Sequence, residues 1–253
     1  MKVDIYSLDG KVSRQAELPD FFSVPVRDDL IRRAVLSEES RLYQPKGAYR
    51  WAGLETSAKY RGRKEMYGAI KNQGIPHLPH EVRPKGQWGK VRRVPHSVKG
   101  RRAHPPKPEK ILIEKINRKE YTLALASALA ATANAERVVQ RHHIKIDHAP
   151  LILEDAVEKL GKTREVVQLL ASLHLSAWIE KAKEKGGKSM LFVVSDASKL
   201  KSAGNIAGVD VVDVAALQVR HLAPGTHPGR LTLFSEKALG ILVKRIQEKG
   251  VNA

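Results

Sequence analysis

The chain contains no cysteine, so it has no disulfide, no thiol nucleophile and no zinc site built on thiolates. It also lacks an apolar run of about 18 residues, and we expect no transmembrane helix. The N-terminal residues 1–6 alternate polar and apolar side chains, unlike a signal peptide. Acidic residues are outnumbered, 27 against 45 Lys and Arg, which gives a net charge of +18. Such a charge points to a polyanionic partner, and nucleic acid is the first candidate because no membrane segment is expected.

The positive charge is concentrated in residues 44–110. They hold 17 Lys and Arg against 4 Asp and Glu, whereas the rest of the chain holds 28 and 23. They also contain 8 Gly and 8 Pro, and their large aliphatic side chains follow no helical or strand period. Such a segment has too little apolar surface to offset the entropy of ordering it. We therefore expect an extended, non-globular basic loop that reaches at most roughly 100 Å, inserted between residues 1–43 and 111–253, which form a globular domain.

The two flanks have the periodicity of a folded domain. A hairpin is expected around Asp9-Gly10, a favoured turn dipeptide, and a helix from Asp28 toward Tyr43. Further helices are expected at 111–133, 163–173, 178–185 and 236–249, and short strands at 151–153, 190–194, 209–212 and 231–234. Because helices separate the strands, the pattern predicts an α/β fold with a mainly parallel sheet flanked by helices.

No motif supports catalysis or cofactor binding. Residues 160–163, Leu-Gly-Lys-Thr, resemble the end of a P-loop, but Ala156 stands where that motif requires glycine. No Gly-x-Gly-x-x-Gly follows a strand. Asp196 follows the 190–194 strand, where open sheets bind ligands, although a turn residue is the simpler interpretation. The ten His show no metal-ligand spacing. We therefore expect no enzymatic activity, no metal, no cofactor and no small-molecule substrate.

Cations and aromatic rings are interleaved within residues 44–110. Cations neutralise phosphates, whereas rings and guanidinium planes stack on unpaired bases. The alternative is a solvated basic arm without a single partner, and two Trp and three Tyr argue against it. The residues predicted to bind RNA are Lys46, Arg50, Trp51, Lys59, Tyr60, Arg61, Arg63, Lys64, Lys71, Arg83, Lys85, Trp88, Lys90, Arg92, Arg93, His96, Lys99, Arg101, Arg102, His104 and Lys107.

Short motifs spread over nearly the whole chain carry a family resemblance. They lie at residues 5–10, 25–31, 92–107, 127–133, 204–208, 222–225 and 228–232. The most extended reads Arg-Arg-Val-Pro-His-Ser-Val-Lys-Gly-Arg-Arg-Ala-His-Pro-Pro-Lys at 92–107. Together, in this order, they resemble the universal large-subunit ribosomal protein four family in its archaeal and eukaryotic form.

The resemblance implies a Rossmann-like domain on the ribosome surface and a loop threaded into large-subunit ribosomal RNA. It also implies a loop tip at the narrow part of the peptide exit tunnel, opposite the loop of ribosomal protein twenty-two. Loop insertion would support early subunit assembly. On this basis we expect a structural, non-enzymatic, cytoplasmic ribosomal protein whose partners are ribosomal RNA and neighbouring ribosomal proteins.

Two other functions are compatible with the residues. A nucleic-acid-modifying enzyme with a Rossmann-like domain and a basic substrate arm would have a cofactor pocket at a strand end. A sequence-neutral DNA-compacting protein would bind duplex DNA as well as folded RNA. The ribosomal hypothesis instead requires co-sedimentation with large subunits.

Overall fold

A computed structural model describes residues 2–146 and 148–248. The chain divides into two compact units. Unit 1 comprises Met1–Leu42 and Ile113–Ala253, and unit 2 comprises Tyr43–Leu112. Unit 1 contains a six-stranded sheet and unit 2 a two-stranded sheet.

The sheet of unit 1 has the strand order β2-β1-β5-β8-β6-β7. The hairpin of β1 and β2 is antiparallel and every other pair is parallel, so the predicted mainly parallel sheet is confirmed. The order differs from the 3-2-1-4-5-6 order of the dinucleotide-binding sheet. The strands are β1 (Lys2–Tyr6), β2 (Val12–Glu17), β5 (Leu151–Leu153), β6 (Met190–Val194), β7 (Val209–Asp213) and β8 (Leu231–Ser235).

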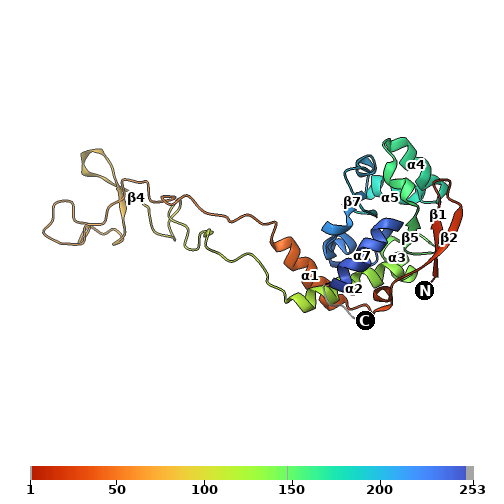
Figure 1. Ribbon diagram of the computed structural model, residues 1–253. Helices are drawn as coiled ribbons and strands as arrows, with labels where there is room; N and C mark the ends of the chain where they lie inside the picture. The colour runs from red at the N-terminus through yellow and green to blue at the C-terminus, as the bar shows by residue number, and fades with distance from the viewer. Residues whose placement is uncertain (1, 147, 249–253) are drawn as a thin grey trace. The chain divides into compact units, whose positions relative to one another are not determined.

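Helices cover both faces of this sheet, and α4 and α5 lie on the opposite side from α1, α2 and α7 (Figure 1). On one face lie α1 (Asp28–Ser40), α2 (Arg118–Ala133), α6 (Val219–Leu222) and α7 (Glu236–Glu248). On the other lie α3 (Ala135–His142), α4 (Thr163–Ser172) and α5 (Ser176–Lys185). A hydrophobic core lies on each face of the sheet, and strand β6 contributes to both because side chains alternate along a strand. Val193 packs on the first face and Phe192 on the second.

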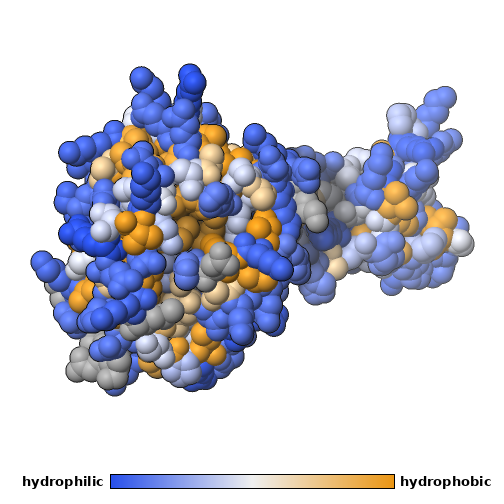
Figure 2. All heavy atoms as spheres, turned by 90° about the vertical axis from the view of Figure 1, so that its right-hand side faces the viewer, coloured by the Kyte–Doolittle hydropathy of each residue, from blue (hydrophilic) through white to orange (hydrophobic). Residues whose placement is uncertain are grey.

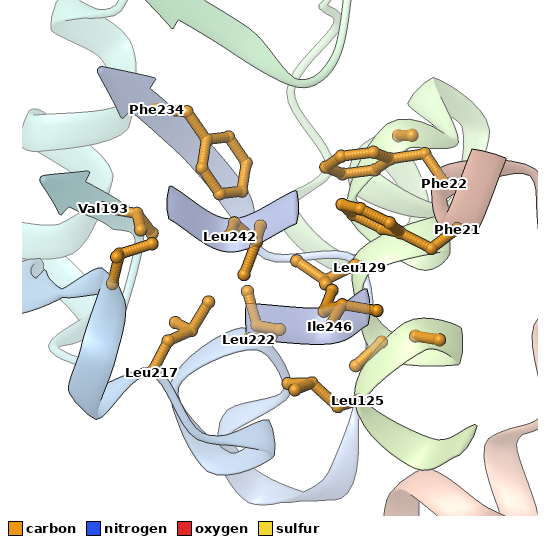
Figure 3. Packing of buried hydrophobic residues seen from close by; sticks show 14 of the residues in the cluster. Phe21, Phe22, Leu125, Leu129, Val193, Leu217, Leu222, Phe234, Leu242 and Ile246 are labelled. Atoms are coloured by element: carbon orange, nitrogen blue, oxygen red, sulfur yellow. The ribbon is translucent and has the colours of Figure 1, made fainter. Parts of the chain in front are cut away.

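The first of these cores is built around aromatic and leucine side chains (Figure 3). Phe22 stands edge-on to Phe234 of β8, with 6.0 Å between ring centroids and 86° between planes. Leu129 of α2 and Leu242 of α7 fill the space beside them. Residues 124–133 of α2 are all buried, so this part of the helix is covered by neighbouring elements on every side. Its many alanines allow neighbouring elements to approach closely.

Several predicted helix boundaries differ from the structure, and α5 begins at Ser176, two residues before the predicted start. The helix expected over 111–133 begins only at Arg118, because Asn117 and Glu120 form a capping box in which the backbone N–H of Asn117 donates to the Glu120 carboxylate at 3.4 Å. Helix α1 ends at Ser40, short of Tyr43. The last helix is described to Glu248, and its predicted end, Lys249, lies outside the described residues.

Short 3-10 turns complete unit 1. They are η1 (Asp20–Ser23), η3 (Asp155–Lys159), η4 (Ala203–Asn205), η5 (Val214–Ala216) and η6 (Pro224–Thr226). Across residues 2–146 and 148–248, no helix has the length and hydropathy that crossing a bilayer requires. On the face of unit 1 turned toward the viewer in Figure 2, hydrophobic areas lie between protruding hydrophilic side chains.

Unit 2 has more regular structure than its composition predicts. Strands β3 (His80–Val82) and β4 (Trp88–Val91) pair antiparallel, joined by a 3-10 turn, η2 (Pro84–Gly86). The sequence pattern predicts no strand here. Strands of three and four residues are too short to establish an alternating pattern, and Pro84 within the connection marks only a turn.

Candidate nucleic-acid interface

Unit 2 has a small buried centre of its own. Ile70 and Ala58 are fully buried, and His80 is nearly so. Backbone bonds join these segments: the Lys59 amide donates to the His80 carbonyl at 3.0 Å, and the Ile70 amide donates to the Arg61 carbonyl at 3.2 Å. Three stretches of chain around residues 58–61, 69–70 and 80 are thereby held together. The cations beside them are thus attached to a defined local backbone.

Trp88 belongs to this local structure. Its indole N–H donates to the Gln73 side chain at 2.9 Å, and its ring stands near the His80 imidazole, with 6.4 Å between centroids. The tryptophan is half-buried. Part of the predicted stacking ring is therefore engaged within unit 2.

Three of the predicted arginines make internal bonds, and the longest of these bonds runs from Arg93 Nη1 to the Ala58 carbonyl at 3.4 Å. Arg92 donates through Nε to Glu81 at 2.6 Å, and through Nη1 to the Val98 carbonyl. Arg61 donates to the Tyr67 carbonyl at 2.6 Å. The hydrogen bond from Arg92 lowers the pKa of Glu81 below its usual value. The guanidinium groups of Arg61 and Arg92 are only partly exposed and hold the segment together, whereas Arg93 is exposed.

All the other predicted side chains are exposed to solvent. Among the rings, Trp51 is 54% exposed and Tyr60 47%. The exposed set is Lys46, Arg50, Trp51, Lys59, Tyr60, Arg63, Lys64, Lys71, Arg83, Lys85, Lys90, Arg93, His96, Lys99, Arg101, Arg102, His104 and Lys107. Exposure leaves these cations and rings accessible to a partner.

Few of the cations have a counter-charge nearby. Within residues 43–112, all of which the structure describes, only Arg63 and Arg92 form ion pairs, with Glu65 at 3.8 Å and Glu81 at 2.6 Å. Glu55 instead accepts from the Tyr49 hydroxyl at 2.5 Å. The remaining Lys and Arg therefore carry uncompensated charge. A polyanion would be attracted to such a surface, and the attraction would be screened by salt.

The residues predicted to bind RNA do not include Tyr67, whose ring is 89% exposed, the most exposed of the large hydrophobic side chains in the described chain. The position of Tyr67 between Lys64 and Lys71 could have identified it as an RNA-binding residue, since an aromatic residue in a cationic stretch suits base stacking.

The strand ends of unit 1 are occupied by protein groups. Glu158 of η3 accepts from the Ser195 amide at 2.8 Å, and Ser195 directly follows β6. A carboxylate at this edge repels the phosphate that an open sheet would bind there. Asp196 accepts from the amide and hydroxyl of Ser198 at 3.0 and 2.6 Å, as a turn residue does. In the described part of the chain, no three His, Asp or Glu are grouped to hold a metal ion.

Comparison with known proteins places the chain among ribosomal proteins. Residues 16–245 match the model of the ribosomal protein L4/L1 family. The chain is 40% identical over 265 residues to large ribosomal subunit protein uL4 of Sulfurisphaera tokodaii, covering 97% of this chain and 95% of that protein. Identity to the protein of the same name is 41% in Methanopyrus kandleri, over 98% of this chain and all of the relative. In Haloarcula marismortui it is also 41%, over 97% of this chain and all of the relative.

These matches span unit 1 and unit 2 alike, and they confirm the resemblance inferred from the short motifs. The relatives are named as ribosomal proteins, in agreement with the prediction of a non-enzymatic function. The chain belongs to the ribosomal protein L4/L1 family, a family of structural ribosomal proteins and not of enzymes.

Proposed function

We propose that this chain is a structural constituent of the large ribosomal subunit in the cytoplasm and binds ribosomal RNA through unit 2. The observation that carries the proposal is the uncompensated charge of residues 43–112. This segment contains 17 Lys and Arg but only 4 Asp and Glu, and only two ion pairs form within it. The names of the archaeal relatives, all large-subunit proteins, support the ribosomal assignment.

The exposed Lys and Arg of unit 2 neutralise phosphates in this proposal, and Trp51 and Tyr60 stack on unpaired bases. Arg61, Trp88 and Arg92 act in two ways. Their internal bonds shape the local backbone, and their exposed atoms contact RNA. The division matters for mutagenesis, because a change at these three positions alters the conformation of the segment as well as its charge.

We further propose that residues 44–110 form an extended loop based in a globular domain of residues 1–43 and 111–253. The family resemblance supports a loop that penetrates ribosomal RNA, reaches toward the peptide exit tunnel near ribosomal protein twenty-two, and contributes to subunit assembly. A long cationic segment suits this role because a folded RNA has an interior to enter, whereas a smooth duplex needs only a surface patch.

The salt dependence of binding tests the proposal. Kd of the full chain for large-subunit ribosomal RNA is measured between about 50 and 200 mM salt. If 8 to 10 cations meet phosphates, the slope of log affinity against log salt is roughly −6 to −9. A slope near −2 contradicts it. Duplex DNA serves as competitor: equal competition would favour the DNA-compacting alternative, whereas the ribosomal proposal predicts preferential binding to folded RNA.

A further inference from the structure

The chain leaves unit 1 after Leu42 and re-enters it at Ile113. Within unit 1, the last turn of α1 is joined to the re-entering chain by two serine side chains. The Ser37 hydroxyl donates to the Glu114 carbonyl at 2.6 Å, and the backbone N–H of Glu114 donates to the Ser40 hydroxyl at 3.0 Å. Both backbone groups of Glu114 are therefore held. We term Ser37, Ser40 and the Glu114 backbone the serine clasp.

The two serines are fixed in place by a packed helix. Both are buried, and the Ser40 hydroxyl also donates to the Ser37 carbonyl at 2.7 Å. Ile31 and Val35 of the same helix are fully buried in the first core. The hydroxyl groups of the serine clasp are thus oriented before any partner is bound.

The re-entering chain has little other support at this point. Ile113, Glu114 and Lys115 are all exposed, and Ile116 is the first residue after them that packs against the core. Apolar packing therefore does not fix the backbone of residues 113–115. The hydrogen bonds of the serine clasp supply that constraint.

Within unit 2, the outgoing and returning parts of the chain lie side by side. The backbone N–H of Ala48 donates to the Pro106 carbonyl at 3.3 Å. Gly53 has a φ of +78 − 4 = +74°, and a Cβ built on it would lie 2.5 Å from the Gly100 carbonyl oxygen. Such an approach requires glycine. Cations predicted to bind RNA lie on both parts of the chain, so RNA binding depends on how the two parts are held together.

We propose that Ser37 and Ser40 are positioning residues for RNA binding. By fixing Glu114 beside the end of α1, they order the point at which the returning chain joins unit 1 before RNA is bound. The inference rests on the proposed function of unit 2. Without the serine clasp, this ordering takes place on binding, and its entropy cost lowers the affinity. The serines are buried and make no contact with RNA themselves.

Removal of either hydroxyl opens the serine clasp. Ser40→Ala leaves the Glu114 N–H without its acceptor, and Ser37→Ala leaves the Glu114 carbonyl without its donor. Affinity of each full-length variant for large-subunit ribosomal RNA should fall about 5- to 30-fold, the equivalent of fixing the backbone of one residue. Faster hydrogen exchange of the Glu114 N–H in Ser40→Ala verifies that the serine clasp is open, and circular dichroism verifies that unit 1 is folded.

Ser172→Ala is the matched control. The Ser172 hydroxyl donates to the Leu169 carbonyl at 2.8 Å within α4, the same kind of bond that Ser40 forms with Ser37. Ser172→Ala should therefore bind RNA like the wild type, even where its Tm falls. An equal loss of affinity in Ser172→Ala would assign the effect to stability alone and overturn the proposal.

The salt dependence separates positioning from contact with RNA. The serine clasp variants lose no cation, so the slope of log affinity against log salt should remain that of the wild type. A slope shallower by about two phosphate contacts would overturn the proposed role, and so would wild-type affinity in both variants. If Ser40→Ala does not fold, Ser37→Ala decides, because it keeps the bond between Ser40 and Glu114.

The wild-type chain distinguishes failure of this inference from failure of the proposed function. A wild-type slope near −2 would refute both, because unit 2 would then make too few phosphate contacts. A steep wild-type slope combined with unchanged affinity in the two serine variants would refute the serine clasp alone.

Discussion

Glu158 accepts a hydrogen bond of 2.6 Å from the hydroxyl of Ser235, the last residue of β8. The same carboxylate accepts from the amide and hydroxyl of Ser195 after β6, at 2.8 and 2.5 Å. A single side chain from η3 thus joins the ends of two neighbouring parallel strands. In nucleotide-dependent α/β proteins this edge of the sheet binds phosphates. Here the Glu158 carboxylate occupies it and links the two strand ends by hydrogen bonds.

Removal of this carboxylate is expected to destabilise unit 1. Glu158→Ala leaves the Ser195 and Ser235 donors without their acceptor, and we expect a loss of about 1–3 kcal/mol in the free energy of unfolding. Urea unfolding measures it. Glu180→Ala is the control, since Glu180 is exposed on α5. Equal stability of the two variants would show that the bonds around Glu158 contribute nothing.

The stabilisation by Glu158 depends on pH. Burial raises its pKa, but the hydrogen bonds from Ser195 and Ser235 outweigh burial and lower the pKa below its usual value. A lowered folded-state pKa means that the stabilisation is complete above the unfolded value of about 4.3 and disappears as pH falls through the folded value. The stability difference between wild type and Glu158→Gln should therefore shrink as pH is lowered from about 6 to about 3. A difference that stays constant or grows would contradict the sign.

A second buried carboxylate is expected to couple α1, α2 and α6. Glu38 accepts from the Tyr121 hydroxyl at 2.6 Å and from the Val219 and Arg220 amides at 3.0 and 2.8 Å. Glu38→Ala should lower the free energy of unfolding by about 2–3 kcal/mol, and Tyr121→Phe by about 1 kcal/mol. A double-mutant cycle should give a coupling energy of at least about 0.5 kcal/mol. Additive effects would mean that the hydrogen bond carries no energy of its own.

Stacking by exposed rings in unit 2 is expected to strengthen RNA binding. Tyr67→Ala should weaken binding to large-subunit ribosomal RNA by about 1–3 kcal/mol, as loss of one base–aromatic stack does. Tyr67→Phe keeps the ring and should bind like the wild type. Filter binding at fixed salt gives both values. If both variants bind like the wild type, Tyr67 does not stack on a base.

Paired and unpaired arginines in unit 2 should behave differently. Arg101 is exposed and forms no ion pair with a described carboxylate, so Arg101→Gln should reduce the magnitude of the salt slope by about one phosphate contact. Arg92→Gln breaks the bonds to Glu81 and Val98 and should additionally weaken protection of unit 2 amides from hydrogen exchange. Identical exchange in both variants would show that Arg92 has no structural role.

The sequence predicts the fold best where the pattern is local. The five-residue apolar run at 190–194 is a fully buried strand, and the turn at Asp9-Gly10 joins the expected hairpin. The pattern places the start of α2 too early, because residues 111–117 are also largely apolar. The capping box of Asn117 and Glu120 fixes the true start at Arg118. The strand order is beyond prediction, because it depends on how helices pack across the sheet.

The candidate site is predictable in its composition but not in its internal bonds. Exposure of cations such as Lys64 and Lys99 follows from a segment with few acidic residues and few apolar ones. The pairing of Arg92 with Glu81 depends on the register of β3 and β4, which no periodicity indicates.

The most direct test of the central claim compares the full chain with a variant in which residues 50–100 are replaced by a short Gly-Ser linker. Affinity for large-subunit ribosomal RNA is measured for both, with circular dichroism and Tm to establish that unit 1 is folded. We predict that the variant retains the unfolding transition of unit 1 and loses tight RNA binding. A folded variant that binds the RNA as tightly as the full chain would contradict the account.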